Sequence, residues 1–324
     1  MVAVSSYRYQ PLSESRSIRL LRLAPGAPKD PLAGDITEVP LDKALGTYMA
    51  LSYVWGDTHL HPDKLLIDGA QLSIGRNLSC ALRHVRSPRS SITLWVDAIC
   101  IDQGSYQEKS SQISLMSTIY AEAESVISWL GEATSESAMG IEVLSYLAGH
   151  HPFDDTAPWN CMPAQDIVHG LQDILRRTYF ERIWIVQEAT LGRRVKMRVG
   201  DMALEWDNDV DTRRFLARIK LLEVSPEWQW NRKFGRSAEP SLLNSVDFRP
   251  IRELLEQAVA AKNRTLNAMV HGFGIDPSCT LLDLVHAMRH LHSADPRDKI
   301  YALMGLAQPA DVAGYPHGTK FNDI

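Results

Sequence analysis

The chain has 324 residues, of which 45% are hydrophobic and 23% charged, and its formal net charge is -5. This balance is typical of a globular protein long enough to build a core without disulfide bonds. The weak acidity argues against a general nucleic-acid binder, whose surface would be basic. The four cysteines are scattered and form no CxxC pair, which argues against a structural zinc site and fits a reducing compartment.

The start of the chain lacks the basic region and the apolar run of a secretory signal. No segment approaches the ~20 consecutive apolar residues that a membrane helix needs. We therefore expect a cytoplasmic protein without a membrane span.

The first part of the chain is predicted to be rich in strands. Residues 1–16 are polar and Ser-rich, which indicates a loose arm, and residues 18–23 alternate as a short strand. Residues 48–54 (YMALSYV) are mostly apolar, as in a buried strand. The pair Asp68–Gly69 stands between two apolar runs and predicts a hairpin, because the tight turn needs positive φ.

Strands and helices then alternate. Asn77 is predicted to cap a helix that runs to about residue 86, and residues 107–122 form an amphipathic helix. Residues 92–101 (ITLWVDAICI) and 125–130 (SVISWL) are expected as buried strands. This alternation predicts a parallel sheet covered by helices.

The rest of the chain is predicted to be largely helical, apart from a hairpin around Gly200–Asp201. Residues 225–248 are polar with two tryptophans and are interpreted as an insertion or a lid. The expected helices span residues 136–149, 165–178, 249–263, 280–292 and 298–306. The fold class is therefore α/β, with a mostly parallel sheet flanked by helices and a largely helical C-terminal part.

Five segments, in this order, resemble the fungal heterokaryon-incompatibility (HET) domain family. They are YMALSYVWGD (48–57), LWVDAICIDQ (94–103), the stretch from Gln112 to ISWLG (112–131), FERIWIVQEA (180–189) and DPRDKIYALMGL (295–306). The ordered set, with its Trp-containing segments, is specific. One departure is Glu108–Lys109, where the family usually has a Glu-Arg pair; lysine cannot form the bidentate contact of an arginine.

The resemblance suggests three regions: an N-terminal arm with edge strands (1–40), the HET domain (41–310) and a C-terminal tail (311–324). The tail has no visible terminator, so we expect the native protein to extend further.

The resemblance implies an effector of fungal incompatibility, in which non-self recognition triggers regulated cell death as a form of innate immunity. The family is distantly similar to TIR domains, which implies a flavodoxin-like core. Some TIR domains cleave NAD with a glutamate, so the resemblance implies a NAD(+) nucleosidase-like glycohydrolase. NAD or a related nucleotide would be the substrate, and no cofactor is expected.

Trp184 and Glu188 form a WxxxE pattern similar to the one that carries the catalytic acid in some TIR enzymes. On a helix, residues i and i+4 share a face. The aromatic ring could stack on the nucleotide while the carboxylate stabilises an oxocarbenium-like centre. Alternatively, Trp184 belongs to the core, and Glu188 caps a helix or pairs with Arg182.

Asp97 and Asp102 interrupt an apolar run near the expected end of a strand, where open α/β sheets bind ligands. Asp97 could accept hydrogen bonds from ribose hydroxyls. Alternatively, each carboxylate caps a neighbouring loop. Trp55 and Asp57 follow the first core strand and are expected either at the rim of a ligand pocket or in a structural turn.

Gln103 and Gln187 could donate hydrogen bonds to a ligand, or equally satisfy loop backbone. His286 and His290 have the i, i+4 spacing of zinc ligands, but HAMRH lacks the glutamate of the metalloprotease pattern, so no metal site is expected.

A second function of a different class also fits the sequence: a non-catalytic signalling module that self-associates or recruits other proteins through aromatic surface residues. A homo-oligomer or other signalling proteins are the expected partners, and nucleic acid is not.

Overall fold

The structure is a computed structural model that describes residues 5–56, 62–207, 209–231, 239–271 and 280–307. Within this part of the chain, the main sheet has nine strands in the order β5-β4-β2-β1-β6-β3-β7-β8-β9. The bounds of these strands, in chain order, are β1 Ser17–Leu23, β2 Leu32–Pro40, β3 Met49–Tyr53, β4 Asp63–Ile67, β5 Ala70–Ile74, β6 Ile92–Trp95, β7 Ser125–Trp129, β8 Arg194–Val199 and β9 Met202–Asp207.

The centre of the sheet is parallel and its two sides are partly antiparallel. Strands β6, β3, β7 and β8 pair in parallel, as do β2 and β4. Strand β1 is antiparallel to both of its neighbours, and the β4–β5 and β8–β9 pairs are hairpins. Asp68, the first residue of the β4–β5 turn, has a φ of 50°, which confirms the hairpin predicted there.

Helices cover the sheet and build a lobe beyond β9. Their bounds are α1 Leu41–Ala44, α2 Arg76–Val85, α3 Asp97–Cys100, α4 Tyr106–Glu122, α5 Ser137–Ala148, α6 Pro158–Cys161, α7 Ala164–Leu175, α8 Trp184–Leu191, α9 Val210–Val224, α10 Pro226–Gln229, α11 Arg249–His271, α12 Leu281–Ala287 and α13 Asp298–Met304. The described residues also form two 3-10 turns, η1 Thr178–Glu181 and η2 Leu242–Ser245. A short hairpin pairs β10 Trp230–Asn231 with β11 Glu239–Pro240.

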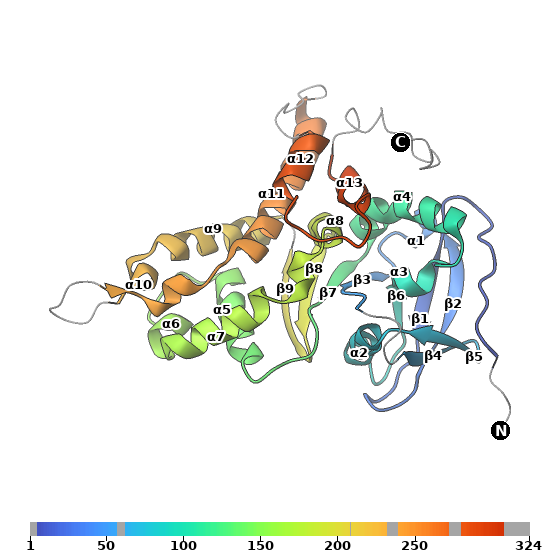
Figure 1. The fold of residues 1–324 in the computed structure, drawn as a ribbon, viewed down its shortest axis with the longest axis horizontal. Coiled ribbons are helices and arrows are strands. Elements are labelled where there is room, and N and C mark those ends of the chain that lie inside the picture. The colour runs from blue at the N-terminus through green and yellow to red at the C-terminus, as the bar shows by residue number, and fades with distance from the viewer. Residues whose placement is uncertain (1–4, 57–61, 208, 232–238, 272–279, 308–324) are drawn as a thin grey trace.

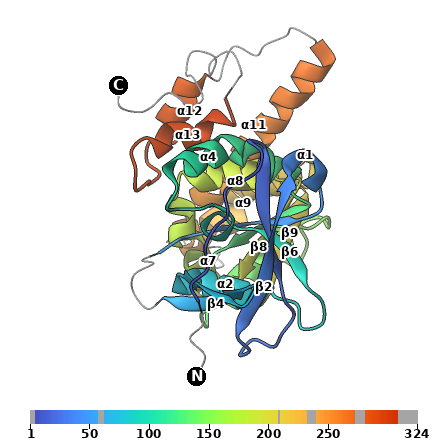
Figure 2. The same cartoon turned by 90° about the vertical axis from the view of Figure 1, so that its right-hand side faces the viewer.

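Figure 1 shows the lobe of α5, α6, α7, α9 and α10 at one end of the molecule and α2 with β4 and β5 at the other. In both views α4, α8 and α13 lie together, and Figure 2 shows the end of α11 projecting from the body. The predicted α/β class with a helical C-terminal part is confirmed.

The buried side chains form two apolar clusters. One gathers β1, β3, β6 and β7 with α2 and α4, and the other gathers β8 and β9 with the helices of the lobe and the C-terminal part. Trp184 packs against both clusters, so α8 lies where the two cores meet.

The N-terminal part differs from the expectation of a loose arm and edge strands. Strand β1 lies inside the sheet, between β2 and β6. Within the preceding segment, the Tyr7 amide donates to the Gln71 carbonyl (2.8 Å), and the Tyr9 hydroxyl donates to the Ile99 carbonyl (2.9 Å). These bonds join the described residues before β1 to the body of the molecule.

A second difference concerns residues 92–101, which were expected as one strand. Strand β6 ends at Trp95, and a helical turn, α3, begins at Asp97. Oδ1 of Asp97 accepts a hydrogen bond from the Ala98 amide (2.7 Å), and this bond satisfies a free backbone donor at the start of the turn. An apolar run alone cannot distinguish a strand from a short buried helix.

No helix among the described residues is both long enough and apolar enough to cross a membrane.

Candidate functional site

Polar side chains converge where the central parallel strands end. Ser52 and Tyr53 close β3, Asp97 follows β6 after one residue, and Glu188 of α8 lies against β3. In open α/β sheets, this edge is where ligands bind. We call the group formed by Ser52, Tyr53, Asp97, Tyr179, Arg182 and Glu188 the carboxylate cluster.

Glu188 is the most enclosed acid of the cluster, with 2% of its surface exposed. Its Oε2 accepts a hydrogen bond from the Ser52 hydroxyl, which also lies 2.9 Å from the Tyr179 hydroxyl. Burial raises the pKa of Glu188 to about 7, although the positive charge of Arg182 and the Ser52 hydrogen bond oppose that rise. A carboxyl group with this pKa is close to half ionised at neutral pH, which suits a general acid or base.

Asp97 lies at the more open side of the cluster and is partly exposed. Its Oδ2 accepts a hydrogen bond from Nε1 of Trp55 (2.7 Å), and the Tyr53 side chain also bonds to the carboxylate. Burial raises the pKa of Asp97, opposed by Arg182 and by these hydrogen bonds. The structure therefore brings Trp55, Asp97 and Glu188 to one place.

Arg182 is the cation of the cluster. Its guanidinium donates to the Tyr53 carbonyl at the end of β3. Burial lowers the pKa of Arg182, but the negative charges of Glu188 and Asp97 outweigh this effect and raise it. Arg182 thus holds a positive charge near two carboxyl groups whose pKa values are raised by burial.

Trp184 and Gln187 find their partners in the C-terminal part of the chain. The Trp184 side chain forms a hydrogen bond with Asp298, the first residue of α13. Gln187 is 2% exposed, and with its amide nitrogen toward the Ala302 carbonyl (3.2 Å), its oxygen accepts from the Ser117 amide (3.1 Å). Gln187 therefore joins α8 to α13 and α4.

Gln103 and Asp102 lie beside the cluster and bond to backbone. Gln103 donates to the Asp97 carbonyl (3.0 Å), and Oδ1 of Asp102 accepts from the Gly104 amide (3.0 Å). Asp57 lies outside the described residues. Gly56, just before it, has a φ of 68°, which fits the predicted turn after β3.

Sequence reasoning missed Ser52 and Tyr179 and treated Arg182 only as a partner for Glu188. Ser52 carried a signal, because it is a polar residue inside an otherwise apolar strand. Tyr179 carried none, because an aromatic residue before an apolar helix is typical of any core.

The cluster offers carboxylates and a guanidinium but no metal site. Among the described residues, no group of three or more His, Cys, Asp or Glu side chains could hold a metal ion. The chemistry open to this arrangement is proton transfer and stabilisation of positive charge on a bound ligand.

The sequence of the chain is similar to a known protein family and to a known protein. Residues 48–188 match the family model described as heterokaryon incompatibility protein (HET). Over 229 residues, 57% of the chain, the sequence is 31% identical to heterokaryon incompatibility protein 6, OR allele, of Neurospora crassa. The match covers 34% of that protein, so the chain spans about a third of the length of this curated relative. No solved structure matches the chain.

The family match begins just before β3 and ends at Glu188, so it contains every residue of the carboxylate cluster. Of the five sequence segments, three lie wholly within the residues that match the family model, and a fourth ends one residue beyond them. Over residues 48–188 the chain therefore resembles the heterokaryon-incompatibility (HET) family.

Proposed function

We propose that this protein acts in fungal heterokaryon incompatibility, where it contributes to cell death after non-self recognition, and that it does so by hydrolysing NAD or a related nucleotide. The name of its Neurospora relative supports the first part. The second part rests on the carboxylate cluster. The chain spans about a third of that relative, so the activity of the whole protein is also part of what we propose.

One observation carries the enzymatic part: an acid with a pKa of about 7 lies beside a fixed cation and a second carboxylate at the ligand-binding edge of the sheet. Burying such groups costs stability, and strongly perturbed ionisable groups concentrate at functional sites. A purely structural role would be served better by apolar side chains of similar volume.

In the proposed reaction, the bond between C1 of the ribose and the nicotinamide nitrogen breaks, and its electron pair leaves with neutral nicotinamide. The ionised Glu188 carboxylate stabilises the positive charge that develops on the sugar. Water then adds to C1, and Glu188 accepts its proton. Asp97 would accept hydrogen bonds from the ribose hydroxyls, and Trp184 or Trp55 would supply an aromatic surface.

The substrate must reach Glu188, although only 2% of this residue's surface is exposed. Trp55, Asp97 and Arg182 are partly exposed, so the substrate would enter from their side. The Trp55 indole, which now bonds to Asp97, would have to release that carboxylate first. We therefore propose that activity requires an opening of this side, for example on assembly.

The test is nicotinamide release from NAD by the purified chain, alone and in assembled states, with Glu188→Gln compared with the wild type. Glutamine keeps the shape of glutamate and can still accept from Ser52, so the fold should persist. Glu122→Gln is the matched control, because the Glu122 side chain lies outside the carboxylate cluster and pairs with Arg193 at the surface. We expect Glu188→Gln to lower the rate at least about a hundredfold and the control to leave it unchanged. Absence of release in every assembled state, with undiminished cell death by Glu188→Gln, would reject the reaction.

A second candidate function, a self-associating module, is favoured by a different observation. Large apolar side chains are exposed on neighbouring elements of the lobe: Leu221 (59%) and Val224 (74%) of α9, Trp230 (47%) of β10 and Leu242 (51%) of η2. Exposed aromatic and aliphatic residues are typical of interfaces. Under this alternative, Val224→Glu would abolish both self-association and cell death, and Glu188→Gln would abolish neither.

A further inference from the structure

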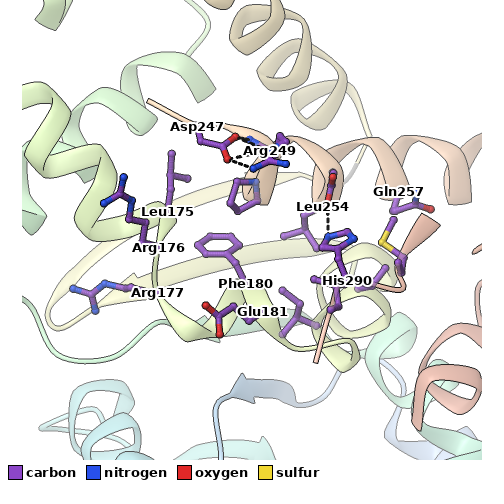
Figure 3. Close-up of a pocket in the computed structure, with 16 residues that line it drawn as sticks. Leu175, Arg176, Arg177, Phe180, Glu181, Asp247, Arg249, Leu254, Gln257 and His290 are labelled. Atoms are coloured by element: carbon purple, nitrogen blue, oxygen red, sulfur yellow. Dashed lines mark hydrogen bonds and ion pairs between the residues drawn. The ribbon is translucent and has the colours of Figure 1, made fainter. Parts of the chain in front are cut away.

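A hollow of about 450 Å³ lies on the side of α8 and η1 away from the carboxylate cluster. Its walls come from the end of α7, η1 and α8 on one side, and from α11 and the turn after α12 on the other (Figure 3). This volume is in the range of small-molecule sites. Neither Asp97 nor Glu188 lines it.

The body of the hollow is apolar. Figure 3 shows the Phe180 ring in its middle, between Leu175 and Leu254. Ile185, Val186 and Leu291 complete this surface. A planar or aliphatic group of a ligand would remove apolar area from water here.

The rim is charged, and most of its charges are already paired. Arg249 binds Asp247 through two nitrogens (2.9 and 2.6 Å), and Nε2 of His290 lies 3.1 Å from Oε2 of Glu253. Arg176 differs: its guanidinium is exposed and forms no hydrogen bond or ion pair with any described residue. The rim therefore carries one guanidinium, Arg176, without an ion pair among the described residues, and one carboxylate, Glu181, that lies 3.6 Å from His292.

The Gln257 side chain lines the far end of the hollow. In Figure 3, Gln257 and Arg176 lie on opposite sides of Phe180.

We propose that this hollow binds a small amphiphilic organic anion. Its apolar, aromatic-sized body rests on Phe180 and the aliphatic side chains around it. Its acidic group pairs with Arg176, and its other end lies against the Gln257 side chain. This assignment stands on its own residues and does not depend on the proposed NAD hydrolysis.

A ligand bound in this hollow would act on the carboxylate cluster through the segment that lies between them. Along one segment, Phe180 and Ile185 face the hollow, while Tyr179, Arg182 and Glu188 belong to the cluster. A bound ligand would therefore press on the opposite side of the segment that positions the cluster. The hollow thus has the placement of an effector site.

The probe for the test is 8-anilinonaphthalene-1-sulfonate, which combines an aromatic body with one anionic group. Its fluorescence rises on transfer to an apolar site, so a titration gives the affinity and the number of sites. We compare the wild type with Arg176→Glu, which reverses the unpaired charge, and His290→Trp, which fills the rim. Arg89→Glu is the matched control, because Arg89 is also exposed and its side chain has no ion pair with any residue that the structure describes.

We expect one saturable site in the wild type, about tenfold weaker binding in Arg176→Glu, and loss of that site in His290→Trp. Arg89→Glu should bind as the wild type does, and decanoate should displace the probe. Equal affinity in Arg176→Glu and the wild type, or equal weakening in Arg89→Glu, would overturn the proposal. Arg176 is exposed and unpaired, so that variant keeps the test decisive even if His290→Trp fails to fold.

Discussion

Glu188 has surroundings that few carboxyl groups have. The hydroxyl of Ser52 bonds to it, the charge of Arg182 attracts it, and water hardly reaches it. Desolvation disfavours the ionised form more than Arg182 favours it, so the pKa rises from 4.5 to about 7. The folded protein therefore binds a proton at Glu188 more tightly than the unfolded chain does.

The difference between the folded and unfolded pKa of Glu188 determines how the free energy of unfolding changes with pH. Between pH 4.5 and about 7 the unfolded chain releases the Glu188 proton while the folded protein keeps it, so the free energy of unfolding falls as pH rises. The full effect corresponds to about 3 kcal/mol. Glu188→Gln cannot titrate, so its stability relative to the wild type should increase across this range and level off above pH 7. Urea unfolding of both proteins at several pH values measures this difference in stability. A difference that stays constant with pH would show that Glu188 titrates normally.

Arg19 and Glu108 form a strongly enclosed ion pair, with side chains 4% and 10% exposed. Two guanidinium nitrogens contact the two carboxylate oxygens, and Arg19 also donates to the Cys100 carbonyl (3.1 Å). Burial raises the pKa of Glu108, but the bond and charge of Arg19 outweigh it and lower the pKa. Glu108 thus makes a bidentate contact with an arginine from β1.

Removal of this arginine should be costly, because Glu108 would keep a buried charge without a partner. We predict that Arg19→Leu lowers the free energy of unfolding by about 3 kcal/mol. Arg16→Leu, three residues earlier in the chain, breaks an exposed pair with Asp42 and should change it by less than about 0.5 kcal/mol. Chemical denaturation of both variants compares them; similar losses would mean that the Arg19 pair contributes no more than a surface contact.

Helices α5 and α7 approach each other closely at two glycines, Gly140 and Gly170. A Cβ atom at Gly140 would lie 2.2 Å from the Gly170 carbonyl oxygen, and one at Gly170 would lie 2.6 Å from the Gly140 amide nitrogen. Both obstacles are backbone atoms, which cannot move aside without shifting a helix. The two glycines therefore set how closely these helices pack.

We predict that Gly140→Ala lowers the free energy of unfolding by roughly 2 kcal/mol, because overpacking outweighs the better helix propensity of alanine. Glu142→Ala, at an exposed position of the same helix, should leave stability almost unchanged. Thermal unfolding distinguishes them. A stabilised Gly140→Ala would show that α5 and α7 can separate freely.

The elements also show what the sequence could and could not predict. The hairpin at Asp68–Gly69 follows from local turn chemistry, and the helices α5 and α7 follow from local periodicity. The interior place of β1 and the end of β6 at Trp95 depend on which segments pair across the sheet. Periodicity contains no information on such pairing, because it reflects only the burial of each residue.

The same limit applies to the candidate site. Trp55, Asp97 and Glu188 could be predicted as candidates, because each follows or faces a central strand in a known family order. The bonds of Trp184 to Asp298 and of Gln187 to Ala302 could not, since these partners are far away in the chain. The ligand-binding roles predicted for these residues stay predictions.

For the whole molecule, the C-terminal part matters because it packs back onto the residues that match the HET family model. Gly305, just after α13, would place a Cβ atom 2.5 Å from Cβ of Ser117 and 2.8 Å from Oε1 of Gln187. Helix α13 therefore reaches both α4 and α8 through a position that admits no side chain. The family match ends at Glu188, so α13 contacts the matched residues from outside them.

We predict that Gly305→Val loosens this contact, because the added methyl groups meet Ser117 and Gln187. Amide hydrogen exchange in α13 should become at least about tenfold faster, and the fluorescence of Trp184 should change. Ile300→Val, at a partly exposed position of the same helix, is the control and should affect neither. Unchanged exchange in Gly305→Val would mean that α13 is held by other contacts alone.

The partners of Trp184 and Gln187 have a consequence for how the protein is made. Translation produces α8 more than a hundred residues before α13. At ordinary elongation rates, the nascent chain would spend on the order of ten seconds with these two side chains lacking their eventual bonds. The ribosome therefore releases α13 well after α8, and the arrival of α13 supplies contacts to side chains whose matched segment ends at Glu188.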